Sequence, residues 1–346
     1  MRADGSAVTV AGSVANGARR PLFLLLLAIA VLVSALLSLV VGSNHLGFGT
    51  AIHVLLHDDG SEAATIVRQV RLPRTLLGIC VGIALGAAGT LMQGHTRNPL
   101  ADPGLLGVTA GAAFAVVLAS QLLSITSPAG QTWFGLAGAL VATATVFGVT
   151  AAGSARLSPV PMALAGAAVT ALLTAFTSII VLSDHTTLDV YRRWAVGSIS
   201  GRDAGVLADV LPFLALGLVL AVFNTRALNV VSLGEDTARG LGQSVTSSRF
   251  VGLAAVTLLT GAATAAAGPV SFLGLIVPHL ARAATGPDHR WLLPCSALGG
   301  AVLLLLADVL GRLLGGAGEV QVGITLAVLG GMFFMVIARR GRLVRL

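Results

Sequence analysis

The sequence predicts an all-α polytopic membrane protein with about ten transmembrane helices. Hydrophobic residues make up 55% of the 346 residues and charged residues only 10%, which is typical of integral membrane proteins. A spanning helix needs roughly 20 predominantly apolar residues, so a chain of this length can hold about ten. The 43 glycines fit helices that pack by close backbone approach in lipid. The regular alternation of apolar and polar residues that a β-barrel would require is not present in the sequence.

The apolar runs begin after a small, polar N-terminal segment. We expect residues 1–18 to form a disordered cytoplasmic tail and residues 19–346 to form a single transmembrane domain. The first run follows Arg19 and Arg20 and exceeds the roughly 7–15 apolar residues of a signal-peptide core, so it is interpreted as an uncleaved helix. The runs are residues 21–41, 75–94, 104–123, 133–152, 160–182, 205–223, 250–268, 269–285, 292–308 and 320–338.

The eighth run is interrupted by Pro269 and Pro278, which predicts a bent or partly re-entrant helix. Near it, G-A-A-T-A-A-A-G at 261–268 resembles G-A-A-G at 86–89, five spans earlier. An odd offset would make the two halves inverted copies of each other. Chance recurrence in Gly/Ala-rich helices explains this similarity equally well.

All 21 basic residues are arginine, as expected from codon bias in a GC-rich genome. Without lysine the chain can form neither a phosphate-binding P-loop nor a Schiff base, so ATP-driven work must come from another polypeptide. The arginines are scattered between apolar runs rather than clustered on one soluble face, which argues against nucleic-acid binding. Cys80 and Cys295 lie inside apolar runs without metal-site spacing. We therefore expect no catalytic, cofactor-binding or metal-binding residues.

Ten spans place both termini on the same side of the membrane. If that side is cytoplasmic, 14 of the 21 arginines lie inside and 7 lie outside. This bias follows the positive-inside rule and predicts cytoplasmic N- and C-termini.

Five sequence blocks, in order, carry a family resemblance. They are R-L-P-R to R-N-P-L-A-D-P-G within 71–107, R-R-W-A-V-G-S-I-S-G at 192–201, S-L-G-E-D-T-A-R-G-L-G-Q at 232–243, G-P-V-S-F-L-G-L-I-V-P-H-L-A-R at 268–282, and A-D-V-L-G-R with E-V-Q-V-G-I within 307–324. The chain resembles the FecCD/BtuC-type ABC importer permeases for iron-siderophore, haem and cobalamin uptake. Gln321 departs from the family pattern, which usually has proline there and so puts the start of the last helix in question.

The resemblance implies an inverted-repeat type II importer fold in a bacterial inner membrane. It implies a permease subunit and not an enzyme, which pairs with a second copy or paralogue and works with separate ABC ATPase subunits. An external substrate-binding protein would deliver the cargo, which we predict to be a ferric siderophore; haem and cobalamin remain alternatives within the family. The resemblance places Arg71, Arg74 and Arg312 at the outer surface as docking residues, where arginine could hold carboxylates of the binding protein.

The resemblance also assigns the cytoplasmic loop at about 225–248 to coupling with the ATPase. The residues that match are Gly234, Glu235, Asp236, Ala238, Arg239, Leu241 and Gly242. Their spacing fits a short amphipathic helix with Ala238 and Leu241 on the packed face. The alternative is a solvated connector between spans six and seven.

A second cytoplasmic loop contains Asn98, Pro99, Asp102 and Pro103. Proline cannot continue a regular helix, and Asn and Asp can cap free backbone groups, so we expect a fixed turn beside the ATPase. Two ionisable residues lie near span ends: His279 is expected to bind freed backbone groups, and Asp308 to pair with Arg312 one turn later.

Two other functional classes are possible. An ion-coupled secondary transporter usually places Asp, Glu or His near the bilayer midplane, and the middles of these runs are nearly free of such residues. A membrane-embedded enzyme would need a clustered set of catalytic side chains, which the runs do not contain. Co-purification with an ATPase would separate the first class from an ABC importer.

Overall fold

The computed structural model describes residues 12–42, 47–153, 159–315 and 318–340, and every regular element within these ranges is a helix. The predicted tail at 1–18 is only partly covered, because the first helix already begins at Gly12 and the residues before it lie outside the described ranges. The arginines at 342 and 345, which contribute to the predicted charge bias, also lie outside the described residues.

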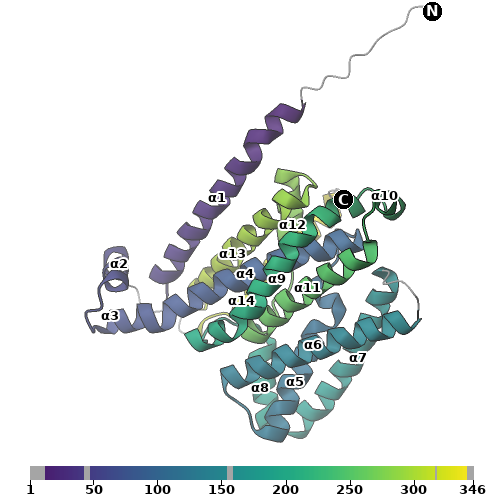
Figure 1. The fold of residues 1–346 in the computed structure, drawn as a ribbon. Helices are drawn as coiled ribbons and strands as arrows, with labels where there is room; N and C mark the ends of the chain where they lie inside the picture. Colours follow the sequence, from purple (N-terminus) through teal and green to yellow (C-terminus); the bar gives the residue numbers. More distant parts are fainter. Residues whose placement is uncertain (1–11, 43–46, 154–158, 316–317, 341–346) are drawn as a thin grey trace, which may run out of the picture.

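Each of the ten predicted apolar runs corresponds to a helix of the structure (Figure 1). Among the described residues, seven helices are long and apolar enough to cross a bilayer, and α5 and α14 are shorter apolar helices. In chain order the helices are α1 (Gly12–Val40), α4 (Leu72–Thr96), α5 (Val108–Leu123), α6 (Pro128–Gly153), α7 (Pro159–Ser183), α9 (Ala204–Val231), α11 (Val245–Ala267), α12 (Leu273–Thr285), α13 (His289–Leu314) and α14 (Val322–Arg340). The predicted all-α polytopic class is confirmed.

Short helices that the apolar pattern does not predict lie at the two ends of the bundle. One end carries α2 (Phe48–Leu56), α3 (Glu62–Thr65), the π-helical turn η1 (Ile66–Arg71) and α8 (His185–Ala195). The opposite end carries the 3-10 turn η2 (Pro103–Leu106) and α10 (Glu235–Gly240). Figure 1 labels α10 at this end. Because α3 and η1 run directly into α4, the second span is one continuous helix of 35 residues.

The helix α4 runs through the middle of the bundle, and its glycines allow this position. Added Cβ atoms at Gly82 and Gly86 would lie 2.5 Å and 2.1 Å from backbone carbonyl oxygens of α13. A Cβ at Gly89 would lie 1.9 Å from the Gly274 oxygen of α12. The backbones therefore touch at these crossings, which is the close packing that small residues permit in lipid.

The eighth run is broken, as its prolines predict. Helix α12 starts only at Leu273 and has 13 residues, which gives a length of about 20 Å. This is shorter than the roughly 30 Å hydrocarbon core of a bilayer. The helix is preceded by the non-helical residues 268–272, in which Gly268 and Phe272 have φ angles of +71° and +66°. Such backbone is tolerated at membrane depth where protein surrounds it.

Three of the sequence blocks meet at this break. The amide of Ser198 donates to the Ala267 carbonyl at 2.7 Å, and the amide of Gly323 donates to the Gly197 carbonyl at 3.0 Å. Gly197 has a φ of +74°, and a Cβ there would lie 2.2 Å from the Pro269 oxygen. Gly197 and Ser198 of the 192–201 block therefore satisfy backbone groups at the end of α11 and the start of α14.

The last helix begins normally in spite of Gln321. The Gln321 carbonyl accepts hydrogen bonds from the amides of Ile324 at 3.1 Å and Thr325 at 3.2 Å. The departure from proline at this position therefore does not disturb the start of α14.

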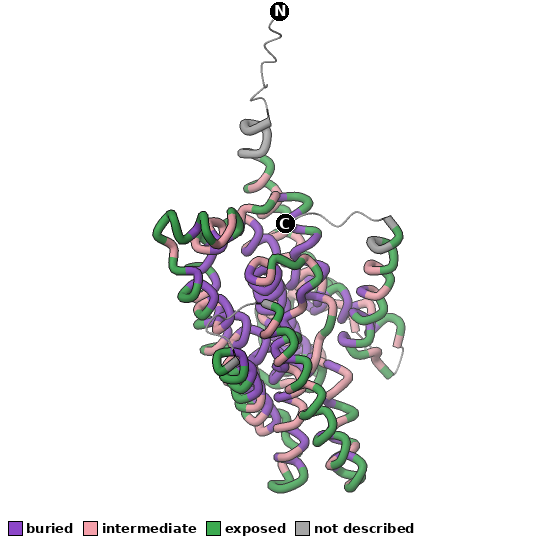
Figure 2. The backbone as a smooth tube through the Cα atoms, turned by 90° about the vertical axis from the view of Figure 1, so that its right-hand side faces the viewer, coloured by how far each residue is buried: buried purple, intermediate pink, exposed green. Residues whose placement is uncertain are grey.

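The burial pattern is that of a membrane bundle (Figure 2). The spans α4 and α11, five spans apart, are the most buried of the seven long ones, whereas α1 and α7 are the least buried. Exposed leucines such as Leu25, Leu32 and Leu182 cover the outer helices. Apolar side chains facing lipid are expected for spans at the edge of a bundle.

Candidate functional sites at the two ends of the bundle

Four charged residues gather where α4, α13 and the segment before α14 meet. We call Arg74, Asp308, Arg312 and Glu319 the arginine–aspartate cluster. Asp308 accepts from Arg74 Nη2 at 2.8 Å and from Arg312 Nη2 at 2.7 Å. Arg74 Nη1 donates to Glu319 at 2.8 Å and to Ser200 at 3.1 Å. The predicted pairing of Asp308 with Arg312 is confirmed, and one buried carboxylate serves two arginines from different helices.

Two arginines also cap the end of α1. Arg312 Nη1 donates to the carbonyls of Ser38 at 2.9 Å and Val41 at 2.6 Å, and its Nη2 donates to the Ser38 hydroxyl at 2.7 Å. Arg71 Nη1 donates to the carbonyls of Leu39 at 2.8 Å and Val40 at 2.7 Å. The last carbonyls of a helix have no intrahelical partner and form the negative end of its dipole, so cations there are favourable.

All three arginines of the docking hypothesis therefore lie at one end, but inside the protein. Their residues are only 5–7% exposed. Apart from Asp308, the partners of these arginines were not predicted from the sequence: they are Ser38, Ser200 and the end of α1. The closeness of α1 to α13 joins residues about 270 positions apart, which no local pattern encodes.

The predicted coupling segment forms α10 at the opposite end of the bundle. Gly234 precedes it with a φ of +117°, and Gly242 follows it with a φ of +79°, so both glycines occupy turns that other residues adopt only with strain. Ala238 is fully buried against Val231 and Val245, as predicted. The short amphipathic helix expected here is therefore present.

The charges of α10 are paired among themselves and with the next span. Arg239 lies 3.2 Å from both Glu235 and Asp236, and Arg249 of α11 lies 2.5 Å from Glu235. The prediction that Leu241 packs inward is wrong: its side chain comes after the last turn of α10, where the chain has left the helix, and it is 66% exposed. Leu233 on the other side of α10 is 65% exposed.

The loop between α4 and α5 is a fixed turn at the same end. The amide of Leu100 donates to the Asn98 side chain at 2.9 Å, and the amide of Gly104 donates to the Asp102 carboxylate at 2.8 Å. Pro103 is buried and begins η2, while Pro99 is half-buried. Desolvation raises the pKa of the Asp102 carboxyl above its ordinary value, and the bond from Gly104 opposes this rise. Arg97 donates to the Val231 carbonyl at 2.5 Å, which ties this loop to the end of α9.

A second polar layer, missed by the sequence reasoning, lies between these loops and the apolar core. We call Gln93, His95, Asn224, Arg282 and His289 the histidine–arginine network. His95 Nε2 lies 3.1 Å from Asn224 Oδ1, and Arg282 donates to Gln93 Oε1 at 3.2 Å from both terminal nitrogens. The available signal was Gln93, His95 and Asn224 themselves, three polar residues at the ends of apolar runs.

This network is incompletely paired within the described part of the chain. His95 Nδ1 and His289 Nε2 are buried without a hydrogen-bond partner there. His289 Nδ1 is held by Asn229 Oδ1 at 2.9 Å, and Asn229 in turn donates to Asp288 at 2.7 Å. Among the residues that the structure describes, His279 forms no hydrogen bond to freed backbone, contrary to expectation; its ring lies edge-on to Phe333 at 6.2 Å instead. No group of three or more metal-ligating side chains occurs among the residues described.

Comparisons with known proteins agree with this arrangement. The model of the FecCD transport family matches residues 27–340. The ferric enterobactin transport system permease protein of Escherichia coli is 43% identical over 310 residues, which cover 90% of this chain and 92% of that protein. The hemin transport system permease protein of Yersinia pestis is 36% identical, covering 94% of this chain and 98% of that protein. A solved inward-facing metal-chelate type ABC transporter matches with a TM-score of 0.82 and 28% identity, over 92% of this chain and 99% of that chain.

Proposed function

This chain belongs to the FecCD transport family and is the permease subunit of an ABC importer, and from that premise we propose that its cargo is a ferric siderophore. The observation that supports the proposal is the cargo stated in the names of its relatives, compared with their sequence identity to this chain. Permeases named for ferric enterobactin, a siderophore, iron(3+)-hydroxamate or ferric citrate are 39–43% identical to it, and an iron-uptake permease of Bacillus subtilis is 31% identical. The hemin permease is 36% identical and a cobalamin permease 38%.

An uptake assay tests the cargo. Cells lacking this gene would be given labelled ferric siderophores, haem or cobalamin, with the gene restored on a plasmid as the control. We expect the deletion to abolish uptake of at least one ferric siderophore while haem and cobalamin uptake stays unchanged. Loss of haem or cobalamin uptake alone would assign the alternative cargo.

We propose that the end carrying α10 faces the cytoplasm of a bacterial inner membrane, together with both termini. The positive-inside count supports this orientation, because 14 of the 21 arginines then lie inside. A cysteine introduced at Asp236, which is fully exposed on α10, would be labelled by a membrane-impermeant thiol reagent only in inverted vesicles. Labelling in intact cells would reverse the orientation.

Coupling to the ATPase is proposed to act through α10 and the leucines beside it. Leu233 and Leu241 are large, apolar and exposed, and exposed apolar side chains next to a charged helix suit a protein interface. Leu241→Asp should abolish co-purification of the ATPase and leave the unfolding temperature unchanged. Leu56→Asp is the matched control, because Leu56 is 70% exposed on α2 at the opposite end. Equal ATPase recovery with both variants would contradict this role.

We propose that the end carrying the arginine–aspartate cluster receives the external binding protein. The family resemblance supports a role for Arg71, Arg74 and Arg312, while their internal bonds mean that they would shape the docking surface from beneath it. Arg312→Gln should then reduce capture of loaded binding protein in a variant that still folds. The exposed pair Arg192 and Arg193 on α8 is the comparison. If capture is lost only when Arg192 and Arg193 are changed to glutamine, the docking site lies at α8 instead.

Two permeases are proposed to pair, with the pathway between them. Helix α14 supports this with a stripe of exposed apolar side chains at helical spacing: Ile324, Val328, Met332 and Met335. Val328→Cys should give a cross-linked dimer in membranes when a second copy or a paralogue faces it. Leu32→Cys tests the equally apolar helix α1. Cross-linking at Leu32→Cys and none at Val328→Cys would place the partner elsewhere.

A further inference from the structure

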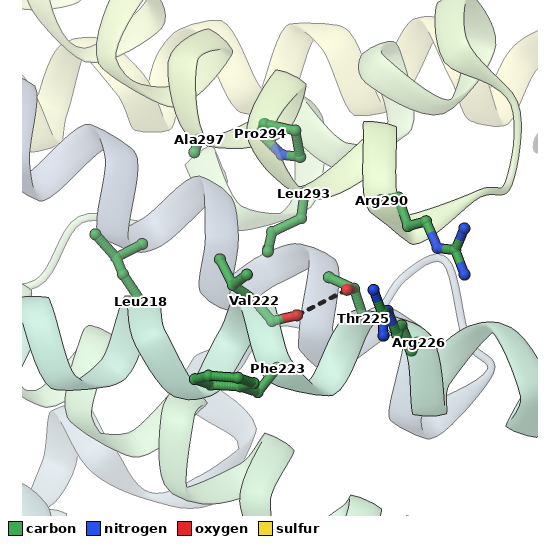
Figure 3. Close-up of a pocket in the computed structure, with 9 residues that line it drawn as sticks. All are labelled: Leu218, Val222, Phe223, Thr225, Arg226, Arg290, Leu293, Pro294 and Ala297. Carbon is green, nitrogen blue, oxygen red and sulfur yellow. Dashed lines mark hydrogen bonds between the residues drawn. The ribbon is translucent and has the colours of Figure 1, made fainter.

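A groove of about 600 Å³ lies between α9 and α13 and plays no part in the sites described so far (Figure 3). Its walls are apolar, with Leu218, Val222 and Phe223 on α9 facing Pro294 and Ala297 on α13. Proline and alanine are short, which leaves room opposite the larger side chains of α9. Val222 and Phe223 are 60% and 76% exposed, so the groove opens to the surroundings of the bundle.

Two arginines stand at one end of this groove. Figure 3 shows Arg226 from α9 and Arg290 from α13 beside the apolar wall, with their guanidinium groups on the same side of it. Both residues are exposed. Within the described residues neither guanidinium group forms a hydrogen bond or an ion pair. The nearby Asp288 carboxylate is held by Asn229 and by the Arg290 amide, and it lies 3.9 Å from Arg20. The mouth of the groove therefore carries two cationic groups with free donors.

The depth of the groove matches one leaflet of a bilayer. Arg226 lies near the end of α9 and Arg290 near the start of α13, both at the end that carries α10. From Arg226 back to Leu218 is eight residues, which is about 12 Å along a helix. An apolar wall of this depth below two arginines offers a headgroup site above an acyl-chain site. Basic pockets between transmembrane helices on the cytoplasmic side bind anionic lipid headgroups in this way.

We propose that this groove binds an anionic phospholipid of the inner leaflet. The phosphate accepts hydrogen bonds from Arg226 and Arg290, whose planar guanidinium groups can hold phosphate oxygens in pairs. One acyl chain lies along Leu218 and Val222 against Pro294 and Ala297. The inner-leaflet placement rests on the proposed orientation, whereas lipid binding itself does not.

Native mass spectrometry of the full-length permease in detergent tests the proposal, with phosphatidylglycerol and phosphatidylcholine titrated separately. We expect a preference for phosphatidylglycerol that falls about 30-fold in the double variant Arg226→Gln/Arg290→Gln, the effect of two basic side chains at an anionic headgroup. The matched control Arg192→Gln/Arg193→Gln removes the same charge at the opposite end and should keep the preference. Ala297→Phe fills the apolar part and should weaken binding of both lipids while both arginines remain.

Three results would overturn the proposal. One is equal phosphatidylglycerol binding by the wild type and the Arg226/Arg290 double variant. Another is competition by inorganic phosphate as strong as by the lipid, which would show an anion site without an acyl-chain site. The third is loss of ATPase co-purification in the double variant with lipid binding unchanged, which would assign the arginines to the ATPase interface. Each readout is independent of cargo uptake, so failure here and failure of the siderophore proposal are distinguishable.

Discussion

The arginine–aspartate cluster and the histidine–arginine network are both buried polar layers, yet they differ in the charge of the groups that pair. In the cluster, Asp308 is 1% exposed and holds two arginines, Arg74 Nη1 reaches Glu319 and Arg312 Nη1 reaches α1, while Arg312 Nε is buried without a hydrogen-bond partner among the described residues. In the network, Arg282 is held by a neutral amide oxygen, and two imidazole nitrogens have no partner among the described residues. The cluster is held mainly by ion pairs, whereas the network is held by neutral hydrogen-bond partners.

This difference suggests which end is built to move. Removing one member of a buried ion pair strands an uncompensated charge and is strongly unfavourable. A layer held by neutral hydrogen bonds can exchange partners at a smaller cost. The network lies beside α10 and the 97–103 loop, where we propose that the ATPase acts. We infer that the cluster fixes α1, α4 and α13 together while the network permits rearrangement near the ATPase.

The largest effect should come from Asp308→Asn. The change leaves Arg74 and Arg312 buried without their shared carboxylate, so the free energy of unfolding should fall by about 3–5 kcal/mol. Thermal or denaturant unfolding in detergent measures this loss. A fall below about 1 kcal/mol would mean that the cluster is not the fixed end of the molecule.

A smaller effect is expected from Gly252→Ala on α11. A Cβ there would lie 1.8 Å from His95 Nε2, so His95 must leave its bond to Asn224. Overpacking of this kind costs about 1–3 kcal/mol. The double variant Gly252→Ala/His95→Ala removes the clash, and it should recover part of the lost stability in the same unfolding assay. If the second change gives no recovery, His95 is not the residue that Gly252 accommodates.

Glu319→Gln should have a still smaller effect. Its side chain is 30% exposed, forms an ion pair with Arg74 and accepts a hydrogen bond from Ser200 at 3.4 Å, and Arg74 keeps Asp308 as a partner. Ion pairs that reach solvent contribute about 1 kcal/mol or less, so stability should fall by no more than that. A loss equal to that of Asp308→Asn would show that Glu319 is an equal member of the cluster.

The smallest effect on stability should come from Arg282→Met. The change removes a buried charge for which the described residues provide no carboxylate partner. This offsets the loss of its bonds to Gln93, so the net change in the free energy of unfolding should stay within about 1 kcal/mol. Transport-coupled ATP hydrolysis in the assembled complex should nevertheless change, because the network would have lost its charged member. Unfolding measurements and ATPase rates on the same preparation check both parts. A destabilisation of about 3 kcal/mol or more would erase the contrast between the two layers.

Much of the fold follows from local patterns in the sequence. Apolar runs of membrane-spanning length located all ten helices, and Pro269 and Pro278 located the broken one, because both signals act within a few residues. The pairing of Asp308 with Arg312 followed from their spacing of four on one helix. These features depend on the bilayer and on helix geometry, which are the same for any chain.

The contacts between distant segments could not be predicted in this way. The capping of α1 by Arg71 and Arg312 requires that the end of α1 meets α4 and α13. The exposure of Leu241 depends on where α10 ends, and helix ends are poorly fixed by periodicity. Arg282 and Gln93 meet only because α12 crosses α4. Each case joins elements whose packing the local sequence does not encode.

Uptake by membrane vesicles tests the central claim most directly. Right-side-out vesicles that carry the permease and its ATPase would be loaded with ATP. The binding protein and a labelled ferric siderophore would then be added outside. Uptake should require internal ATP, should stop in the Leu241→Asp variant, and should persist when an uncoupler collapses the proton gradient. Uptake that proceeds without ATP and is abolished by the uncoupler would contradict the account and favour an ion-coupled carrier.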